Sequence, residues 1–312
     1  MRSILPRMDY FRRGCLGLWA ATLVVGACCG ACDSNRSTAA PPATVIPNRI
    51  VTIAPNAAET IAALGAADRL VGVSRYCDYP PKLIGLPKVG GLIDPDLEAI
   101  LRLRPDLVII RGRIPRLERL CRDRGIPLYR DQTETFDDIF TTITELGALL
   151  DKTTEALKLV ASLRDRVERI RRAVAGRPRP RVLFTTNREP VSLSRVTTAG
   201  KNTFVNSVLT LAGGENVFGK LDVDYPEVGL EDILLERPEV IIEVIPTLDR
   251  LSDTMRKQIE DQWRRLGPLP AIRDQRLHIL LDSSVVIPSP RVAESVERIA
   301  RLLHPEVVFD GH

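Results

Sequence analysis

The chain has 312 residues, enough for about two domains of the usual size. Its 44% hydrophobic and 27% charged residues are typical of a folded globular protein, which excludes a disordered one. The net charge is +4, and most of this excess lies in residues 1–27, so a nucleic-acid partner is not expected. Beyond that segment no apolar stretch approaches the roughly 20 residues of a membrane span, which excludes a polytopic membrane protein.

Residues 1–27 are predicted to be a lipoprotein signal peptide. Basic residues up to Arg13 precede an apolar run, Cys15–Ala27, whose length suits the hydrophobic region of a signal better than a membrane span. The run ends in Val25-Gly26-Ala27-Cys28, which resembles a bacterial lipobox, so Cys28 is the predicted lipidation site. An ordinary secretory signal cleaved at the same place is the alternative, and Cys32 is a competing site of lipidation.

Residues 28–48 are polar and rich in proline, and we expect them to form a flexible tether. The predicted location is therefore the periplasm, with a lipid anchor in a membrane. Export would place the chain in an oxidising compartment. After the tether only Cys77 and Cys121 remain, and the sequence leaves open whether they pair.

From Arg49 onward short apolar segments alternate with helical ones, which is typical of parallel-sheet α/β structure. We expect a first lobe over residues 49–150. Its predicted strands are Ile50–Ile53, Leu70–Val73, Leu107–Ile110 and Pro127–Tyr129. Its predicted helices are Ala57–Leu64, Leu97–Leu103, Ile114–Arg124 and Phe136–Leu150.

A long helix is predicted over residues 151–177, where apolar residues recur every three or four positions. Asp151 is expected to cap its start, and Gly176 and Pro178 are expected to end it. About 25 residues at 1.5 Å each would give a helix of about 37 Å. The second lobe is expected over residues 178–312. Its predicted elements are Val182–Thr185, Phe204–Leu211, Leu230–Leu235, Val240–Val244, Thr254–Arg264, Leu277–Leu281 and Arg291–Leu303.

Two segments 133 positions apart repeat the same pattern. Leu97-Glu98-Ala99-Ile100-Leu101 leads to Arg104-Pro105-Asp106, and Leu230-Glu231-Asp232-Ile233-Leu234 leads to Arg237-Pro238-Glu239. Any short helix that feeds a strand through a proline turn would share the proline and the apolar run. It would not share a glutamate directly after the first leucine, so we predict an internal duplication.

No catalytic motif is found in the sequence: there is no GxSxG, P-loop, HExxH or CxxC, and no GxGxxG between a strand and a helix. All three histidines lie in the last 35 residues, which excludes a three-histidine metal site shared by both halves. A nitrogenase-like enzyme would need ligating cysteines in both lobes, whereas Cys77 and Cys121 lie in the first. A binding protein with a cleft between its lobes is therefore expected, without metal or cofactor. A surface scaffold with no small ligand is the other class left open.

From Arg49 to about Glu306 the chain resembles the substrate-binding proteins of ABC transporters that have a rigid connecting helix, the type that captures cobalamin and ferric siderophores. The resemblance rests on these ordered motifs: Ala54-Pro55-Asn56 with Glu59, Val71-Gly72-Val73-Ser74, Tyr76-Cys77-Asp78-Tyr79-Pro80-Pro81, Arg104-Pro105-Asp106-Leu107-Val108-Ile109, Gly200-Lys201, Gly213-Gly214-Glu215-Asn216-Val217-Phe218 and Ser289-Pro290-Arg291. The Tyr-x-Asp-Tyr-Pro and Gly-Gly-Glu-Asn-x-Phe patterns favour the members that bind corrinoids.

This resemblance implies two Rossmann-like lobes joined by one long rigid α-helix, with cobalamin or another corrinoid in the cleft between them. It also implies a monomer that catalyses no reaction and delivers its ligand to a dimeric ABC permease with ATPase subunits. A ferric-siderophore or haem binding protein of the same fold is the alternative. In that case Arg111 would hold an anionic iron complex.

Ligands of open parallel sheets bind beyond the carboxyl ends of the strands. The candidates in those loops are Asn56, Tyr76, Asp78, Tyr79 and Arg111 in the first lobe, and Thr197, Tyr225 and Ser283 in the second. Aromatic faces and a few hydrogen-bond donors suit a corrin ring. For Asp78 and Tyr79 a local turn before the prolines explains the residues equally well.

The cobalamin-binding relatives carry an aromatic residue six positions before a glutamate in each lobe. Tyr225 preserves this before Glu231, whereas Leu92 stands in that place before Glu98, and Thr197 replaces a further aromatic residue. Each glutamate is a first-turn helix acid that the helix dipole would stabilise. The resemblance implies a further role for both, docking onto arginines of the two permease subunits.

Overall fold

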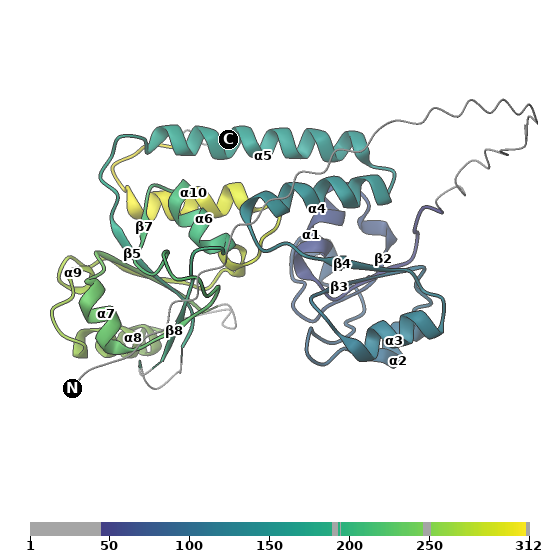
Figure 1. Cartoon of the computed structure of the whole chain (residues 1–312), viewed down its shortest axis with the longest axis horizontal. Helices are drawn as coiled ribbons and strands as arrows, with labels where there is room; N and C mark the ends of the chain where they lie inside the picture. Colours follow the sequence, from purple (N-terminus) through teal and green to yellow (C-terminus); the bar gives the residue numbers. More distant parts are fainter. Residues whose placement is uncertain (1–44, 189–192, 194, 246–250, 310–312) are drawn as a thin grey trace, which may run out of the picture. The chain divides into compact units, whose positions relative to one another are not determined.

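Two β-sheets, one from each half of the chain, organise the computed structural model (Figure 1). The structure describes residues 45–188, 193, 195–245 and 251–309. The predicted signal peptide, Cys28 and the tether up to residue 44 lie outside the described residues, so those predictions stay untested.

The first sheet has the order β2-β1-β3-β4, with all neighbouring strands parallel. Its strands are β1 (Ile50–Thr52), β2 (Leu70–Val73), β3 (Leu107–Arg111) and β4 (Leu128–Asp131). The accompanying helices are α1 (Pro55–Ala63), α2 (Leu97–Arg102), α3 (Pro115–Asp123) and α4 (Phe136–Leu149), with short 3-10 turns at Ala67–Arg69 and Pro81–Leu83. The strands and helices expected for this lobe are all present, with their ends shifted by at most two residues.

The long helix α5 (Thr153–Ala173) follows α4 and packs against α4 and α10 (Val292–Leu303). The prediction that Asp151 caps it is wrong. Asp151 has a positive φ of 55°, the helix begins only after Lys152, and no side chain caps its start. Its 21 residues give about 32 Å, shorter than predicted, because helical geometry stops before the left-handed Gly176.

The second sheet has the order β10-β9-β5-β6-β8, and β7 also pairs with β5. Its strands are β5 (Arg181–Arg188), β6 (Val196–Thr198), β7 (Glu215–Asn216), β8 (Glu227–Val228), β9 (Val240–Val244) and β10 (Leu277–Leu280). Besides α10, its helices are α6 (Phe204–Leu211), α7 (Leu230–Glu236), α8 (Asp253–Arg265) and α9 (Pro270–Arg273), with a 3-10 turn at Ser283–Val286. The antiparallel strands β6 and β8 were not predicted, because two or three residues carry no readable alternation.

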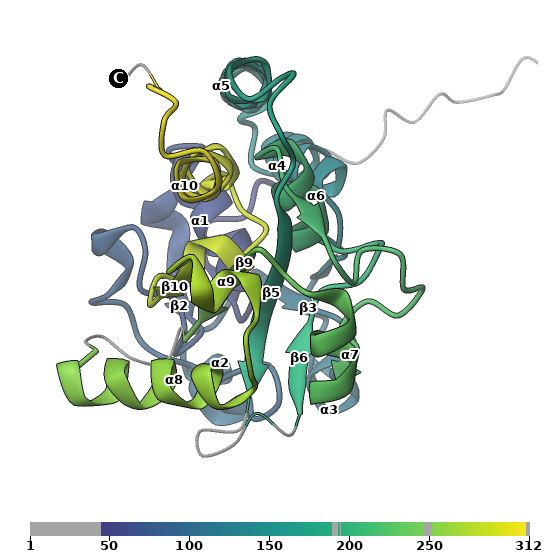
Figure 2. The same cartoon turned by 90° about the vertical axis from the view of Figure 1, so that its left-hand side faces the viewer.

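The hydrophobic core is continuous across both lobes on one side of the sheets. Ile109 of β3 and Ile242 of β9 belong to the same buried cluster as the apolar faces of α1, α4, α5, α6 and α10. The opposite faces are separate: α2 and α3 cover the first sheet, and α7 and α8 cover the second, where Trp263 is fully buried. Figure 2 shows α5 and α10 on one side of the second sheet and α8 on the other. One helical layer therefore holds both sheets.

The repeat found in the sequence is matched by equivalent hydrogen bonds in the two lobes. The Arg49 guanidinium donates to the carbonyl of Leu103 after α2, and the Arg181 guanidinium donates to that of Glu236 at the end of α7. Arg104 and Arg237, which follow these helices, both have φ of 45°. Each helix then leads into the strand paired with the first strand of its sheet, β3 with β1 and β9 with β5. These shared contacts support the predicted duplication.

Candidate ligand-binding site

The candidate residues of the first lobe follow the carboxyl ends of its parallel strands, as predicted. Tyr76, Asp78 and Tyr79 come after β2, and Arg111 is the last residue of β3. Tyr76 is 58% exposed and its ring lies against Gly91, where a Cβ atom would approach the ring to 3.0 Å. Asp78 is exposed as well. These side chains are therefore accessible to a ligand.

Arg111 joins two carboxylates at the end of the neighbouring strand. Its guanidinium lies 3.4 Å from the carboxylate of Asp131, which is buried, and 3.2 Å from the carboxylate of Glu134, which is exposed. Asn56 donates to the same Asp131 at 2.9 Å and is only 2% exposed. The expectation that Asn56 faces the ligand is therefore wrong, because its amide serves the buried network that fixes Arg111.

The second lobe contacts this network through the start of α6. The backbone N–H of Phe204, at the start of α6, donates to the carbonyl of Glu134 at 2.9 Å. Partial burial raises the pKa of Tyr225, the negative charge of Glu134 raises it further, and the positive charge of Arg111 opposes them. Tyr225 therefore lies within electrostatic range of Arg111 and Glu134, and the contact that joins the two lobes here is the hydrogen bond from Phe204 to Glu134.

A second junction between the lobes surrounds Tyr79. The Arg291 guanidinium lies over its ring, 4.3 Å from the centroid, and binds both carboxylate oxygens of Glu59 at 2.8 and 2.5 Å. Glu59 and Arg291 are both largely buried, with side chains 4% and 11% exposed. Burial raises the pKa of Glu59 despite the attraction of Arg291. The arginine of the Ser-Pro-Arg motif therefore fixes the first-lobe glutamate and one face of Tyr79.

For two predicted site residues of the second lobe, the structure describes few contacts with the other candidates. Ser283 begins the 3-10 turn after β10, between Asp282, whose carboxylate lies 3.6 Å from the Arg291 guanidinium, and Ser284. Thr197 lies on β6, partly buried, opposite Glu227 of β8. No contact described for Thr197 joins it to the other candidates, so its role stays a prediction.

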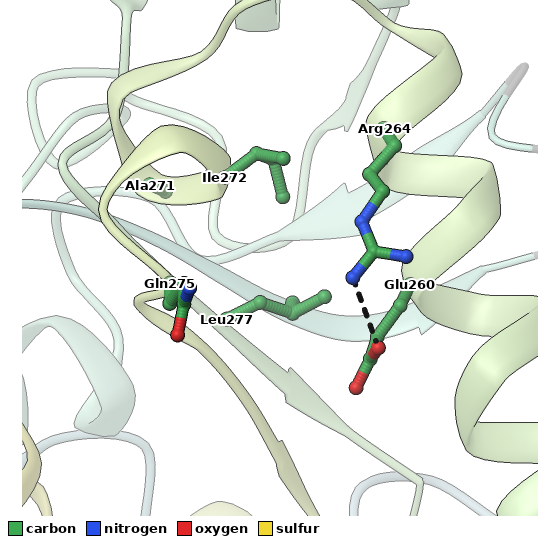
Figure 3. Close-up of a pocket in the computed structure, with 6 residues that line it drawn as sticks. All are labelled: Glu260, Arg264, Ala271, Ile272, Gln275 and Leu277. Carbon is green, nitrogen blue, oxygen red and sulfur yellow. Dashed lines mark hydrogen bonds and ion pairs between the residues drawn. The ribbon is translucent and has the colours of Figure 1, made fainter.

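A pocket of about 670 Å³ opens beside Arg111 at the end of β3. Leu92 lines it together with Arg111, so the place where an aromatic residue was expected lies at the pocket. A smaller pocket of about 250 Å³ lies between α8, α9 and β10 (Figure 3). Its charged residues, Glu260 and Arg264, pair with each other, and none of the predicted site residues lines it.

Glu98 and Glu231 occupy matching places in the first turns of α2 and α7. The Glu98 side chain is 89% exposed, and its nearest cation is Arg102 at 3.7 Å on the same helix. Glu231 is also exposed. The adjacent acids do the capping: Asp96 accepts from the N–H of Ala99, and Asp232 accepts from that of Gly229. Both glutamates are therefore available to a partner.

Cys77 and Cys121 are free and buried, in clusters on opposite faces of the first sheet. A disulfide between them, which the sequence left open, is thus not formed. Within the described ranges no group of His, Cys, Asp or Glu side chains is arranged to hold a metal ion. Of the described helices, none is long and apolar enough to cross a membrane.

A family model described as periplasmic binding protein matches residues 50–283. The chain belongs to the periplasmic binding protein family. Over 260 residues it is 30% identical to a vitamin B12-binding protein of Vibrio cholerae, which covers 82% of this chain and 88% of that relative. Membership confirms the predicted family and the two-lobed α/β fold, and it places the chain among transport components, as predicted, and not among enzymes.

Two solved structures resemble this fold. The periplasmic vitamin B12 binding protein of V. cholerae matches with a TM-score of 0.69 at 28% identity, over 83% of this chain and 98% of that one. A periplasmic heme binding protein from Pseudomonas aeruginosa matches with a TM-score of 0.75 at 24% identity, over 84% and 94% of the two chains. At that identity the second likeness concerns the fold alone.

Sequence reasoning did not assign a role at the site to Asp131, Glu134 or Arg291. Arg291 and Glu59 were noted as motif residues, which was the available signal. Their pairing was hidden because 232 positions separate them. Asp131 ends β4 and Glu134 lies in the loop after it, like other acids in such places, and only the folded chain brings them to Arg111.

Proposed function

We propose that this periplasmic binding protein captures a corrinoid, with cobalamin as the candidate, between its two lobes and delivers it to an ABC permease. The observation that carries the binding site is the junction of the lobes beside the pocket at the end of β3, where the Phe204 N–H of the second lobe donates to the carbonyl of Glu134 and the Glu134 carboxylate pairs with Arg111. Exposed faces of Tyr76 and Tyr225 suit a broad planar ring. The choice of ligand is supported by relatives named as vitamin B12-binding proteins.

A ferric-siderophore or haem ligand is the second candidate. Arg111 could hold an anionic iron complex, and the chain has few aromatic residues, with 4% of Phe, Trp and Tyr together. The fold is also shared with a heme binding protein. Both candidate functions use the same site between the lobes, and they differ in the ligand that binds there.

The deciding experiment is the absorbance spectrum of protein separated from free ligand after incubation with cobalamin, with haem or with a ferric siderophore. We expect corrin bands to co-elute with the protein at a stoichiometry near one. Iron-complex bands without corrin bands would replace the proposal by its alternative. No retained ligand in any arm would favour the scaffold class.

The lipid anchor at Cys28 is also a proposal, which the lipobox-like sequence supports. Cys28→Ala should move the protein from the membrane fraction to the soluble periplasmic fraction. Cys32→Ala is the matched control and should leave fractionation unchanged. If Cys32→Ala alone releases the protein, the anchor belongs to that cysteine.

A further inference from the structure

The pocket at the end of β3 has a distinct chemical character. Two segments of the first lobe line it, one before α2 and one that leads into α3. Its lining combines apolar and cationic side chains, among them Leu92, Ile93, Ile114, Arg111, Arg113 and Arg116. Gly112, with φ of 67°, turns the chain after β3 so that the arginines on both sides of it reach the same pocket.

The three arginines differ in what they already bind. Arg111 is held by Asp131 and Glu134, as described above. Arg113 and Arg116 are exposed and form no ion pair within the described ranges. The pocket therefore presents two guanidinium groups that are not committed to the protein.

The acids nearest this pocket are neutralised by other residues. Asp94, which lines the pocket, binds Arg75 at 2.6 Å. Glu118, one turn into α3, binds Arg130 at 3.0 Å. Glu118 also caps the start of α3, where its carboxylate accepts from the backbone N–H of Ile114 at 2.8 Å, so the positive charge at the pocket comes from the arginines. The local charge is thus positive, next to an apolar wall.

We infer that Arg113 and Arg116 form a subsite for an anionic group on the edge of the ligand, a phosphate or a carboxylate. The inference rests on the proposed function, since it takes the ligand to be a planar macrocycle bound beside Arg111. Guanidinium groups bind such oxygens through paired hydrogen bonds. Leu92 and Ile114 would contact the apolar edge of the macrocycle. Cobalamin offers a phosphate and haem offers carboxylates, so separate arms of one experiment distinguish them.

The test uses Arg113→Gln/Arg116→Gln in the full chain, titrated calorimetrically with cobalamin, with cobinamide, which lacks the phosphate, and with haem. Arg122→Gln is the matched control, because Arg122 is exposed on the same helix but does not line the pocket. We expect the double variant to bind cobalamin about ten- to hundredfold more weakly and cobinamide as tightly as wild type. The control should bind both ligands normally.

The outcomes separate the two proposals. If the double variant binds cobalamin as tightly as wild type, the subsite is wrong and the corrinoid function stands. An equal loss for cobalamin and cobinamide also overturns the subsite, because the phosphate would then not be its target. If wild type binds haem alone and the double variant weakens that binding, the subsite stands and the corrinoid proposal falls.

Discussion

The two lobes share a scaffold and differ in the residues that follow the carboxyl ends of their strands. Asp106 accepts from the backbone N–H of Arg49, and Glu239, 133 positions later, accepts from that of Arg181. By contrast, the first lobe ends its strands in a buried polar network with a basic pocket, whereas the second lobe meets that network through the backbone N–H of Phe204 at the start of α6. The comparison supports a duplication that preserved how each sheet is built, while the loops after the strands diverged.

The largest effect is expected where the two lobes are joined. Arg291→Met leaves the buried carboxylate of Glu59 without its partner and should lower the free energy of unfolding by about 3–5 kcal/mol. Since burial already raises the pKa of Glu59, losing the arginine raises it further. Protonation then stabilises the folded variant, so its deficit should shrink as the pH falls from 8 toward 5.

Chemical denaturation at several pH values measures this deficit. Arg75→Met is the matched control, because its pair with Asp94 is exposed and should contribute little. Glu59→Leu/Arg291→Met should recover much of the stability, as no buried charge remains. A deficit of the same size at pH 5 and pH 8 would contradict the role given to Glu59.

The next prediction concerns Glu98 and Glu231, which occupy equivalent positions in the two lobes and are expected to dock together onto the permease. Glu98→Ala and Glu231→Ala should each impair uptake in a reconstituted importer, and the double variant should reduce it more than tenfold. Ligand affinity and melting temperature should stay near wild type, because both side chains are exposed. Asp96→Ala is a useful contrast, since it removes a helix cap and should lower stability by about 1 kcal/mol. Normal uptake by the double variant would reduce the two glutamates to helix-start acids.

A smaller loss of stability is expected when the equivalent arginine of either lobe is replaced. Arg49→Ala and Arg181→Ala each remove hydrogen bonds to the carbonyl at the end of a helix. Each should lower the free energy of unfolding by about 0.5–1.5 kcal/mol, with the larger value for Arg181, which also pairs with the carboxylates of Glu215 and Glu236. A clear loss in one lobe and none in the other would limit the duplication to sequence pattern.

The smallest effect is expected when the native protein is treated with a thiol reagent. Burial raises the pKa of Cys77 to about 12, so its thiol stays protonated and unreactive at pH 8. Native protein should therefore react slowly with a thiol reagent, and protein in urea should show both Cys77 and Cys121 as free thiols. Rapid labelling of Cys77 in native protein would indicate that the segment after β2 opens.

The sequence predicted the regular elements well because apolar periodicity and proline turns mark them locally. It missed β6 and β8, which are too short to show a period and exist through pairing with distant strands. At the site it offered Tyr225 and Arg111 as candidates, which stay predictions, but placed Asn56 wrongly, since burial beside Asp131 depends on a contact 75 positions away. Arg113 and Arg116 resemble ordinary solvated arginines in a sequence, and only the pocket distinguishes them.

The central claim is that both lobes contribute to one corrinoid site, and calorimetric titration of cobalamin tests it most directly. Tyr76→Ala in the first lobe and Tyr225→Ala in the second should each weaken binding by about 1–3 kcal/mol, because each removes an aromatic face. Tyr76→Phe and Tyr225→Phe keep the ring and should bind nearly as wild type does. Wild-type affinity in both alanine variants would contradict a site shared between the lobes.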